Sequence, residues 1–146
     1  MIFLLKEWLD FLAYPFYLLA GRRPWRPGYY TAKKRTICHG IDQRLPASGG
    51  GLPPNYGGRI DERVVEYPWV FGQLPAKPGR VLDAGSALNH GFLLERAPLR
   101  DASLTIMTLA PERRCFWQRG ISYVYGDLRE PYFAAGEFDM VISVST

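Results

Sequence analysis

A short stretch, residues 79–95, combines an acid, a glycine and small side chains in an order that suits a ligand-binding turn. An apolar run ends in Asp83, and Gly85 and Ser86 follow before a segment with helical apolar spacing. This order predicts a buried parallel strand, a tight turn and a helix N-terminus, the arrangement that cradles nucleotide-like ligands. Gly85 allows close backbone approach and a positive φ at low cost. A tight turn that binds no ligand is the alternative interpretation.

The other residue types that commonly carry chemistry are isolated in this sequence. Cys38 and Cys115 have no metal-ligand spacing, and neither do His39 and His90, so we expect no metal site. Two distant cysteines without a convincing signal peptide predict reduced thiols and a cytoplasmic protein. No residue is assigned a catalytic role from the sequence.

The elements that must position the turn alternate along the second half of the chain. Beside the strand that enters the turn, three further strands are expected at residues 103–107, 121–125 and 138–144. Two helices are expected between strands, at residues 89–97 and 111–119. Strands that alternate with helices predict a parallel sheet with crossover helices. The predicted fold class is therefore α/β, a Rossmann-like parallel sheet with flanking helices, preceded by a mainly helical N-terminal arm.

The N-terminal arm begins with a strongly apolar segment, residues 1–20, which Lys6, Glu7 and Asp10 interrupt on one stripe of a helix. Charges of both signs and Pro15 argue against a spanning helix. Three arginines follow by residue 26, and the aromatic residues Trp8, Trp25, Tyr29 and Tyr30 lie nearby. Two interpretations stay open: a helix docked on the domain, or a peripheral membrane contact through residues 1–26 on the cytoplasmic face.

A glycine- and proline-rich linker is expected over residues 45–58. It predicts a division into an arm and linker, residues 1–58, and a second domain, residues 59–146. Within the latter, a helix is expected over residues 61–74, with Pro68 kinking or ending it.

Charge is distributed unevenly between these parts. Residues 1–44 carry eight lysines and arginines against three acids, whereas the rest of the chain is nearly neutral. The excess is small and confined to the arm, so no nucleic-acid partner is expected.

Four segments of the second domain together resemble the class I S-adenosylmethionine-dependent methyltransferases. The family's motifs are similar to Val-Leu-Asp-Ala-Gly at 81–85, Leu-Ala-Pro-Glu at 109–112, Gly-Asp-Leu-Arg at 126–129 and Phe-Asp-Met-Val-Ile-Ser at 138–143. The resemblance covers residues 79–146, and a subgroup of bacterial methyltransferase-like proteins looks similar as well. It implies S-adenosylmethionine as cofactor, an unidentified methyl acceptor, and the first four strands of a sheet whose family order is 3-2-1-4-5-7-6.

The resemblance also implies a cofactor-binding set of six residues. The turn at Gly85 and Ser86 would lie against the amino-acid and ribose portions of the cofactor. Asp83 would orient backbone amides of this turn, or receive the cationic methionine end through water. The remaining three would surround the adenine: Asp127 accepts from its amino group, Leu128 supplies a backbone N–H, and Leu109 covers a face.

The sequence departs from the family at the end of the second strand. Thr108 stands where an acid usually binds both ribose hydroxyls, so a weaker cofactor affinity is expected. The chain also closes at Thr146, after the fourth strand. We therefore expect an incomplete fold: a truncated gene product, a fragment, or a half that another chain completes. Methyl transfer by this chain alone is not expected, and the open apolar edge at 140–144 predicts self-association.

Two functional interpretations follow. One is an S-adenosylmethionine-dependent methyltransferase-like protein. The other is a non-catalytic membrane-surface or association protein with a degenerate Rossmann-like domain. A nicotinamide-dependent oxidoreductase is less favoured, because the turn has no Gly-x-Gly-x-x-Gly pattern.

Overall fold

The structure, a computed structural model, describes residues 2–45, 51–130 and 132–144. It divides into two compact units, Met1–Gln73 and Leu74–Thr146. Residues 59–73, expected from the sequence in the second domain, lie in the first unit, because the helix at Arg63–Gln73 packs against another helix of that unit. Residues 46–50 of the expected linker lie outside the described residues.

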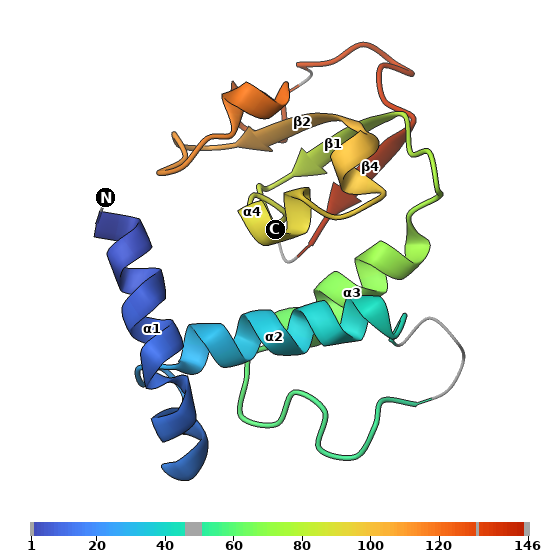
Figure 1. Cartoon of the computed structure of the whole chain (residues 1–146). Coiled ribbons are helices and arrows are strands. Elements are labelled where there is room, and N and C mark those ends of the chain that lie inside the picture. The colour runs from blue at the N-terminus through green and yellow to red at the C-terminus, as the bar shows by residue number, and fades with distance from the viewer. Residues whose placement is uncertain (1, 46–50, 131, 145–146) are drawn as a thin grey trace. The chain divides into compact units, whose positions relative to one another are not determined.

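The first unit is helical, as the sequence predicted. It contains α1 (Ile2–Leu19), α2 (Tyr29–Asp42) and α3 (Arg63–Gln73) (Figure 1). Helix α2 packs against both of the others, and its buried face includes Tyr29 and Ile37. Within the described residues, no helix is long and apolar enough to cross a membrane.

Helix α2 was not predicted as a separate element, because its cap comes from a distant part of the chain. Gly28 at the N-cap has no side chain to offer. Instead, the Asp10 carboxylate of α1 accepts hydrogen bonds from the backbone N–H of Gly28 at 2.7 Å and of Thr31 at 2.6 Å. The Thr31 hydroxyl donates to the same carboxylate at 2.8 Å. Asp10 therefore satisfies amides that the first turn of α2 would otherwise leave unpaired.

Helix α3 continues through Pro68, so this proline does not end it. Proline has no N–H to donate to the carbonyl of Val64, one turn earlier. The Tyr56 hydroxyl lies 3.0 Å from this carbonyl oxygen and 3.1 Å from that of Thr36 in α2. Tyr56 thus compensates for the proline and joins the two helices.

The second unit contains the predicted four-stranded parallel sheet. Its strands are β1 (Arg80–Ala84), β2 (Ser103–Thr108), β3 (Ser122–Tyr125) and β4 (Met140–Ser143), in the order β3-β2-β1-β4. In register, Leu82 of β1 lies between Thr105 of β2 and Val141 of β4. The α/β fold class and the expected strand order are confirmed.

The segments between strands are less helical than predicted. The helix expected over 89–97 is reduced to α4 (Gly91–Leu94), followed by a 3-10 turn at Leu99–Asp101. The helix expected over 111–119 is wrong, since only Trp117–Arg119 form a 3-10 turn. An α-helix would need the Arg114 carbonyl and the Phe116 N–H for its own hydrogen bonds. Both groups instead bond to side chains from other parts of the second unit.

Candidate functional site

The turn that follows β1 is organised around Asp83, whose side chain is 0% exposed. One carboxylate oxygen accepts from the backbone N–H of Ala87 at 3.2 Å and the other from that of Leu88 at 2.8 Å. A buried carboxylate is stable only where such donors surround it. Of the two roles expected for Asp83, the structure shows the orientation of backbone amides.

Two residues in this turn have the left-handed backbone conformation. Gly85 has φ of 105° and donates its N–H to the Met107 carbonyl of β2 at 2.8 Å. Ser86 has φ of 62°, which is uncommon for a residue with a side chain. Its hydroxyl oxygen is buried and has no hydrogen-bond partner among the described residues. Strain together with an unsatisfied polar atom marks this turn as a candidate functional site.

A network that the sequence did not predict joins this turn to the segment after β2. The Tyr123 hydroxyl of β3 donates to the side-chain oxygen of Asn89 at 2.9 Å and accepts from the Phe116 N–H at 2.9 Å. The Asn89 amide nitrogen donates to the Arg114 carbonyl at 3.0 Å. Burial raises the pKa of Tyr123, so its hydroxyl remains a donor. Nothing in the local sequence signals these contacts, because their partners lie on different connections of the sheet.

The segment after β2 also contacts the end of β3. The Cys115 sulfur lies 3.5 Å from the Tyr125 hydroxyl oxygen, and this hydrogen bond is the main cause that raises the pKa of Tyr125. Leu109, expected to cover adenine, is 75% exposed. Thr108, at the end of β2, accepts through its carbonyl from the N–H of Gly126 at 2.9 Å.

Asp127, expected to contact adenine, forms an ion pair with Arg129 (2.5 Å between the closest atoms). The Arg129 backbone N–H donates to the same carboxylate at 2.9 Å. Hydrogen bonds from Arg129 lower the pKa of Asp127, so the carboxylate stays ionised and acts as an acceptor. The Arg129 side chain is largely exposed and can therefore leave this pair at little cost.

The six expected binding residues lie at the end of β1 or in the loops that follow β1, β2 and β3, at one edge of the sheet. Asp83, Gly85 and Ser86 lie at the end of β1, Leu109 follows β2, and Asp127 and Leu128 follow β3. Carboxyl ends of neighbouring parallel strands meet at the same edge, so the fold gathers these segments. The structure thus brings together the three segments that hold the expected binding residues. The Asp127 carboxylate, however, binds its neighbour Arg129.

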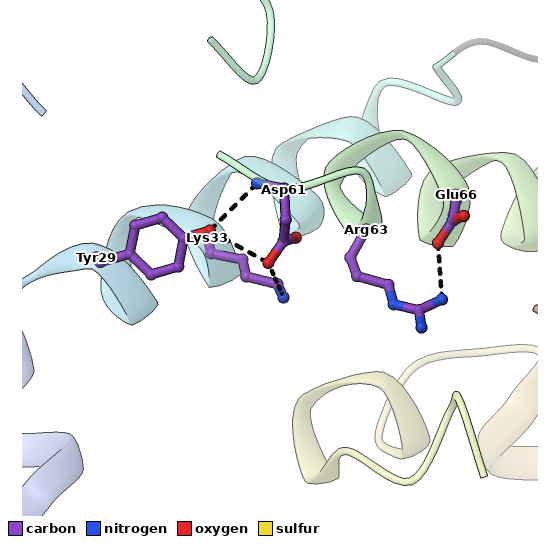
Figure 2. Close-up of polar contacts among 5 residues, drawn as sticks. All are labelled: Tyr29, Lys33, Asp61, Arg63 and Glu66. Carbon is purple, nitrogen blue, oxygen red and sulfur yellow. Dashed lines mark hydrogen bonds and ion pairs between the residues drawn. The ribbon is translucent and has the colours of Figure 1, made fainter. Parts of the chain in front are cut away.

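A second polar cluster lies in the first unit, where α2 meets the start of α3 (Figure 2). The Asp61 carboxylate accepts from the Lys33 ammonium at 2.7 Å and from the Tyr29 hydroxyl at 3.2 Å. The Asp61 N–H donates back to the Tyr29 oxygen at 3.2 Å, and Arg63 pairs with Glu66 at 2.7 Å. Burial raises the pKa of Tyr29. The Asp61 contacts join the start of α3 to α2, whereas the pair of Arg63 and Glu66 lies within α3, so we assign the cluster a structural role.

Two shallow, open hollows of about 580 and 340 Å³ lie in the first unit. Cys38, His39 and Asp42 line the larger one. Among the described residues, however, no three His, Cys, Asp or Glu side chains converge closely enough to hold a metal ion.

Comparison with known proteins finds no match to a family model, to a curated protein or to a solved structure.

Proposed function

We propose that this protein is an S-adenosylmethionine-dependent methyltransferase-like protein that binds its cofactor at the carboxyl edge of the sheet in the second unit. One observation carries the proposal: the strand order reverses between β1 and β4, and the strained turn at Gly85 and Ser86 follows β1 at this point. In open α/β sheets, ligands bind outside the carboxyl ends of the strands where the order reverses.

The residues at this edge fit the cofactor in part. The unpartnered Ser86 hydroxyl is a polar group that a ligand could satisfy after a small movement of the turn. Leu109 is an exposed apolar side chain, suited to a face of an adenine ring, and the backbone N–H of Leu128 is assigned to the edge of the ring. The Asp127 carboxylate can accept from the cofactor when the exposed Arg129 side chain leaves their ion pair. The affinity for the cofactor should be weak at Thr108, because one hydroxyl replaces only part of the bidentate contact that a carboxylate makes with the two ribose hydroxyls.

When bound, the cofactor supplies a methyl group on a positively charged sulfur that a nucleophile can accept. Such a transfer depends chiefly on positioning, so the residues named here bind and orient and none is assigned a catalytic role. The methyl acceptor is unidentified. A cytoplasmic location belongs to the same proposal and agrees with the free thiols of Cys38 and Cys115.

The test is calorimetric titration of the full chain with S-adenosylhomocysteine, the product form of the cofactor. We expect binding in the micromolar range and a loss of about tenfold or more in Asp127→Ala, the size of one hydrogen bond to a charged group. The matched control is Asp101→Ala, because Asp101 also forms an exposed ion pair with a neighbouring arginine, Arg100, and lies outside the proposed site.

Two outcomes would count against the proposal. No heat of binding by a chain with native circular dichroism would contradict it and favour the non-catalytic alternative. Equal affinities of Asp127→Ala and the wild type would contradict the assigned role of Asp127.

A further inference from the structure

Helix α1 presents its polar side to the rest of the first unit and its apolar side to solvent. The inward residues, Asp10, Tyr14 and Tyr17, recur at spacings of three and four, which place them on one face of a helix. Tyr17 is 2% exposed and packs against Tyr29 of α2. This orientation is the reverse of an ordinary surface helix, which buries its apolar face.

The outward face of α1 consists of large apolar side chains. Trp8, Leu12 and Phe16 follow one another at four-residue spacing, and Trp8 and Phe16 are 65% and 72% exposed. The other exposed apolar residues of the helix extend this face: Leu5, Leu9, Phe11, Leu18 and Leu19. Exposed apolar side chains that are contiguous rather than scattered mark an interaction surface.

The outward orientation of this face is held by specific contacts. Rotating α1 to bury its apolar side would remove Asp10 from the N-terminus of α2 and Tyr17 from its packed position. The first loss would leave the N–H groups of Gly28 and Thr31 without their acceptor, and the second would remove the packing partner of Tyr29. The contacts of Asp10 and Tyr17 therefore fix the apolar face of α1 in its exposed orientation.

Positive charge lies immediately after this helix. Arg22, Arg23 and Arg26 are exposed, and their side chains form no ion pair within the described part of the chain. Trp25, between them, is also exposed. Arginine and tryptophan beside an apolar helical face are typical of helices that lie in a lipid interface.

We propose that α1 and the segment 22–26 bind the surface of an anionic lipid bilayer, with the outward face of α1 inserted among the acyl chains. The three arginines would lie at the level of the headgroups, where each anionic lipid neutralises a charge that forms no ion pair among the described residues. A second copy of the same face would bring the same three cations against these arginines, whereas an anionic bilayer brings the opposite charge. This inference is independent of cofactor binding.

Flotation of the full-length protein with lipid vesicles tests the proposal. We expect the protein to float with vesicles of phosphatidylcholine and phosphatidylserine and to float less with phosphatidylcholine alone. The double variant Trp8→Glu, Phe16→Glu should reduce the partition coefficient by about tenfold or more, since it places charges in the acyl region. The control is Trp69→Glu, the same change at an exposed tryptophan of α3, which should float like the wild type.

A second set of variants tests the charge. Replacing Arg22, Arg23 and Arg26 by glutamine should weaken binding to anionic vesicles by roughly fivefold for each arginine. The control lowers the net charge equally at three other exposed cations, with glutamine at Arg44, Lys77 and Arg113. These variants decide the outcome if circular dichroism shows that the double variant of α1 does not fold.

Three results would overturn the proposal. In the first, the outward-face variant and Trp69→Glu float equally. In the second, the two arginine sets behave alike. In the third, light scattering without vesicles finds a dimer that Trp8→Glu dissociates, which would assign the face to a second copy of the chain.

Discussion

Asp10 connects two helices through one carboxylate. It accepts the N–H groups of Gly28 and Thr31, and it thereby caps α2 and holds α1 in its orientation. Loss of a helix cap costs about 1–2 kcal/mol. We expect Asp10→Ala to lower the free energy of unfolding by this amount, measured by urea denaturation with circular dichroism, whereas Asp101→Ala should change it little. Equal stabilities of Asp10→Ala and the wild type would show that the cap contributes nothing.

Asp139 and Arg80 connect β4 to β1 at the start of both strands. The guanidinium and backbone N–H of Arg80 donate to the Asp139 carboxylate and lower its pKa to about 2. In the unfolded chain an aspartate titrates near pH ~4. The folded state binds fewer protons between these two values, so this contribution to stability is present above pH ~4 and is lost as the pH falls toward ~2.

An NMR titration of the Asp139 carboxyl carbon measures the pKa of this residue in the folded protein directly. We expect a midpoint of about 2 in the folded protein. The variant Asp139→Asn should have a stability that depends less on pH between ~4 and ~2 than that of the wild type. A carboxyl midpoint near 4 would show that the pair with Arg80 does not form in solution.

At the scale of the element, the contact between α2 and α3 depends on a residue without a side chain. A methyl group on Gly40 would overlap the Tyr56 hydroxyl and lie 2.7 Å from the Pro68 ring. Alanine favours helix by about 1 kcal/mol over glycine, but overpacking at a close contact costs about 1–3 kcal/mol. We therefore expect Gly40→Ala to destabilise the protein by up to about 2 kcal/mol in thermal or urea unfolding.

Gly51→Ala is the control, since a methyl group there meets no atom within 4 Å. A second variant identifies the cause: Tyr56→Phe removes the overlapping oxygen, so the penalty of Gly40→Ala should be smaller in the Tyr56→Phe background. A stabilising Gly40→Ala would mean that helix propensity outweighs the packing at this position.

The elements that sequence reasoning predicted are those whose signal is local. The strands arise from apolar and β-branched runs bounded by turns, and their ends were predicted to within about two residues. The missed elements depend on distant partners. Asp10 caps α2, and Asn89 and Tyr123 bind backbone groups of the segment 111–119 that a helix would use. No local pattern encodes such contacts.

The same distinction applies to the candidate site. The turn at Asp83 could be predicted because acid, glycine and small residues are adjacent in the sequence. The ion pair of Asp127 with Arg129 is also local, but no sequence pattern distinguishes an arginine partner from a ligand. The identity of a ligand depends on the combined geometry of three loops, and this arises only when the sheet forms.

At the scale of the whole molecule, the two proposed activities belong to different compact units. Cofactor binding is assigned to the second unit and lipid binding to the first. Each proposal therefore has variants that should leave the other unaffected. Substitutions at Trp8 or Arg23 should change vesicle binding alone, and a substitution at Asp127 should change cofactor affinity alone.

Self-association is the remaining whole-molecule expectation, and β4 is the element that would support it. It lies at an edge of the described sheet, and Val141 on this strand is 61% exposed. An apolar edge strand can pair with another chain, and a lysine on such a strand opposes this. We expect Val141→Lys to raise the dissociation constant for self-association by roughly fivefold or more in sedimentation equilibrium. The control Val141→Thr retains a β-branched side chain without charge and should associate like the wild type. Two results would exclude β4 as the contact: a wild-type chain that remains monomeric at high concentration, or equal association of all three proteins.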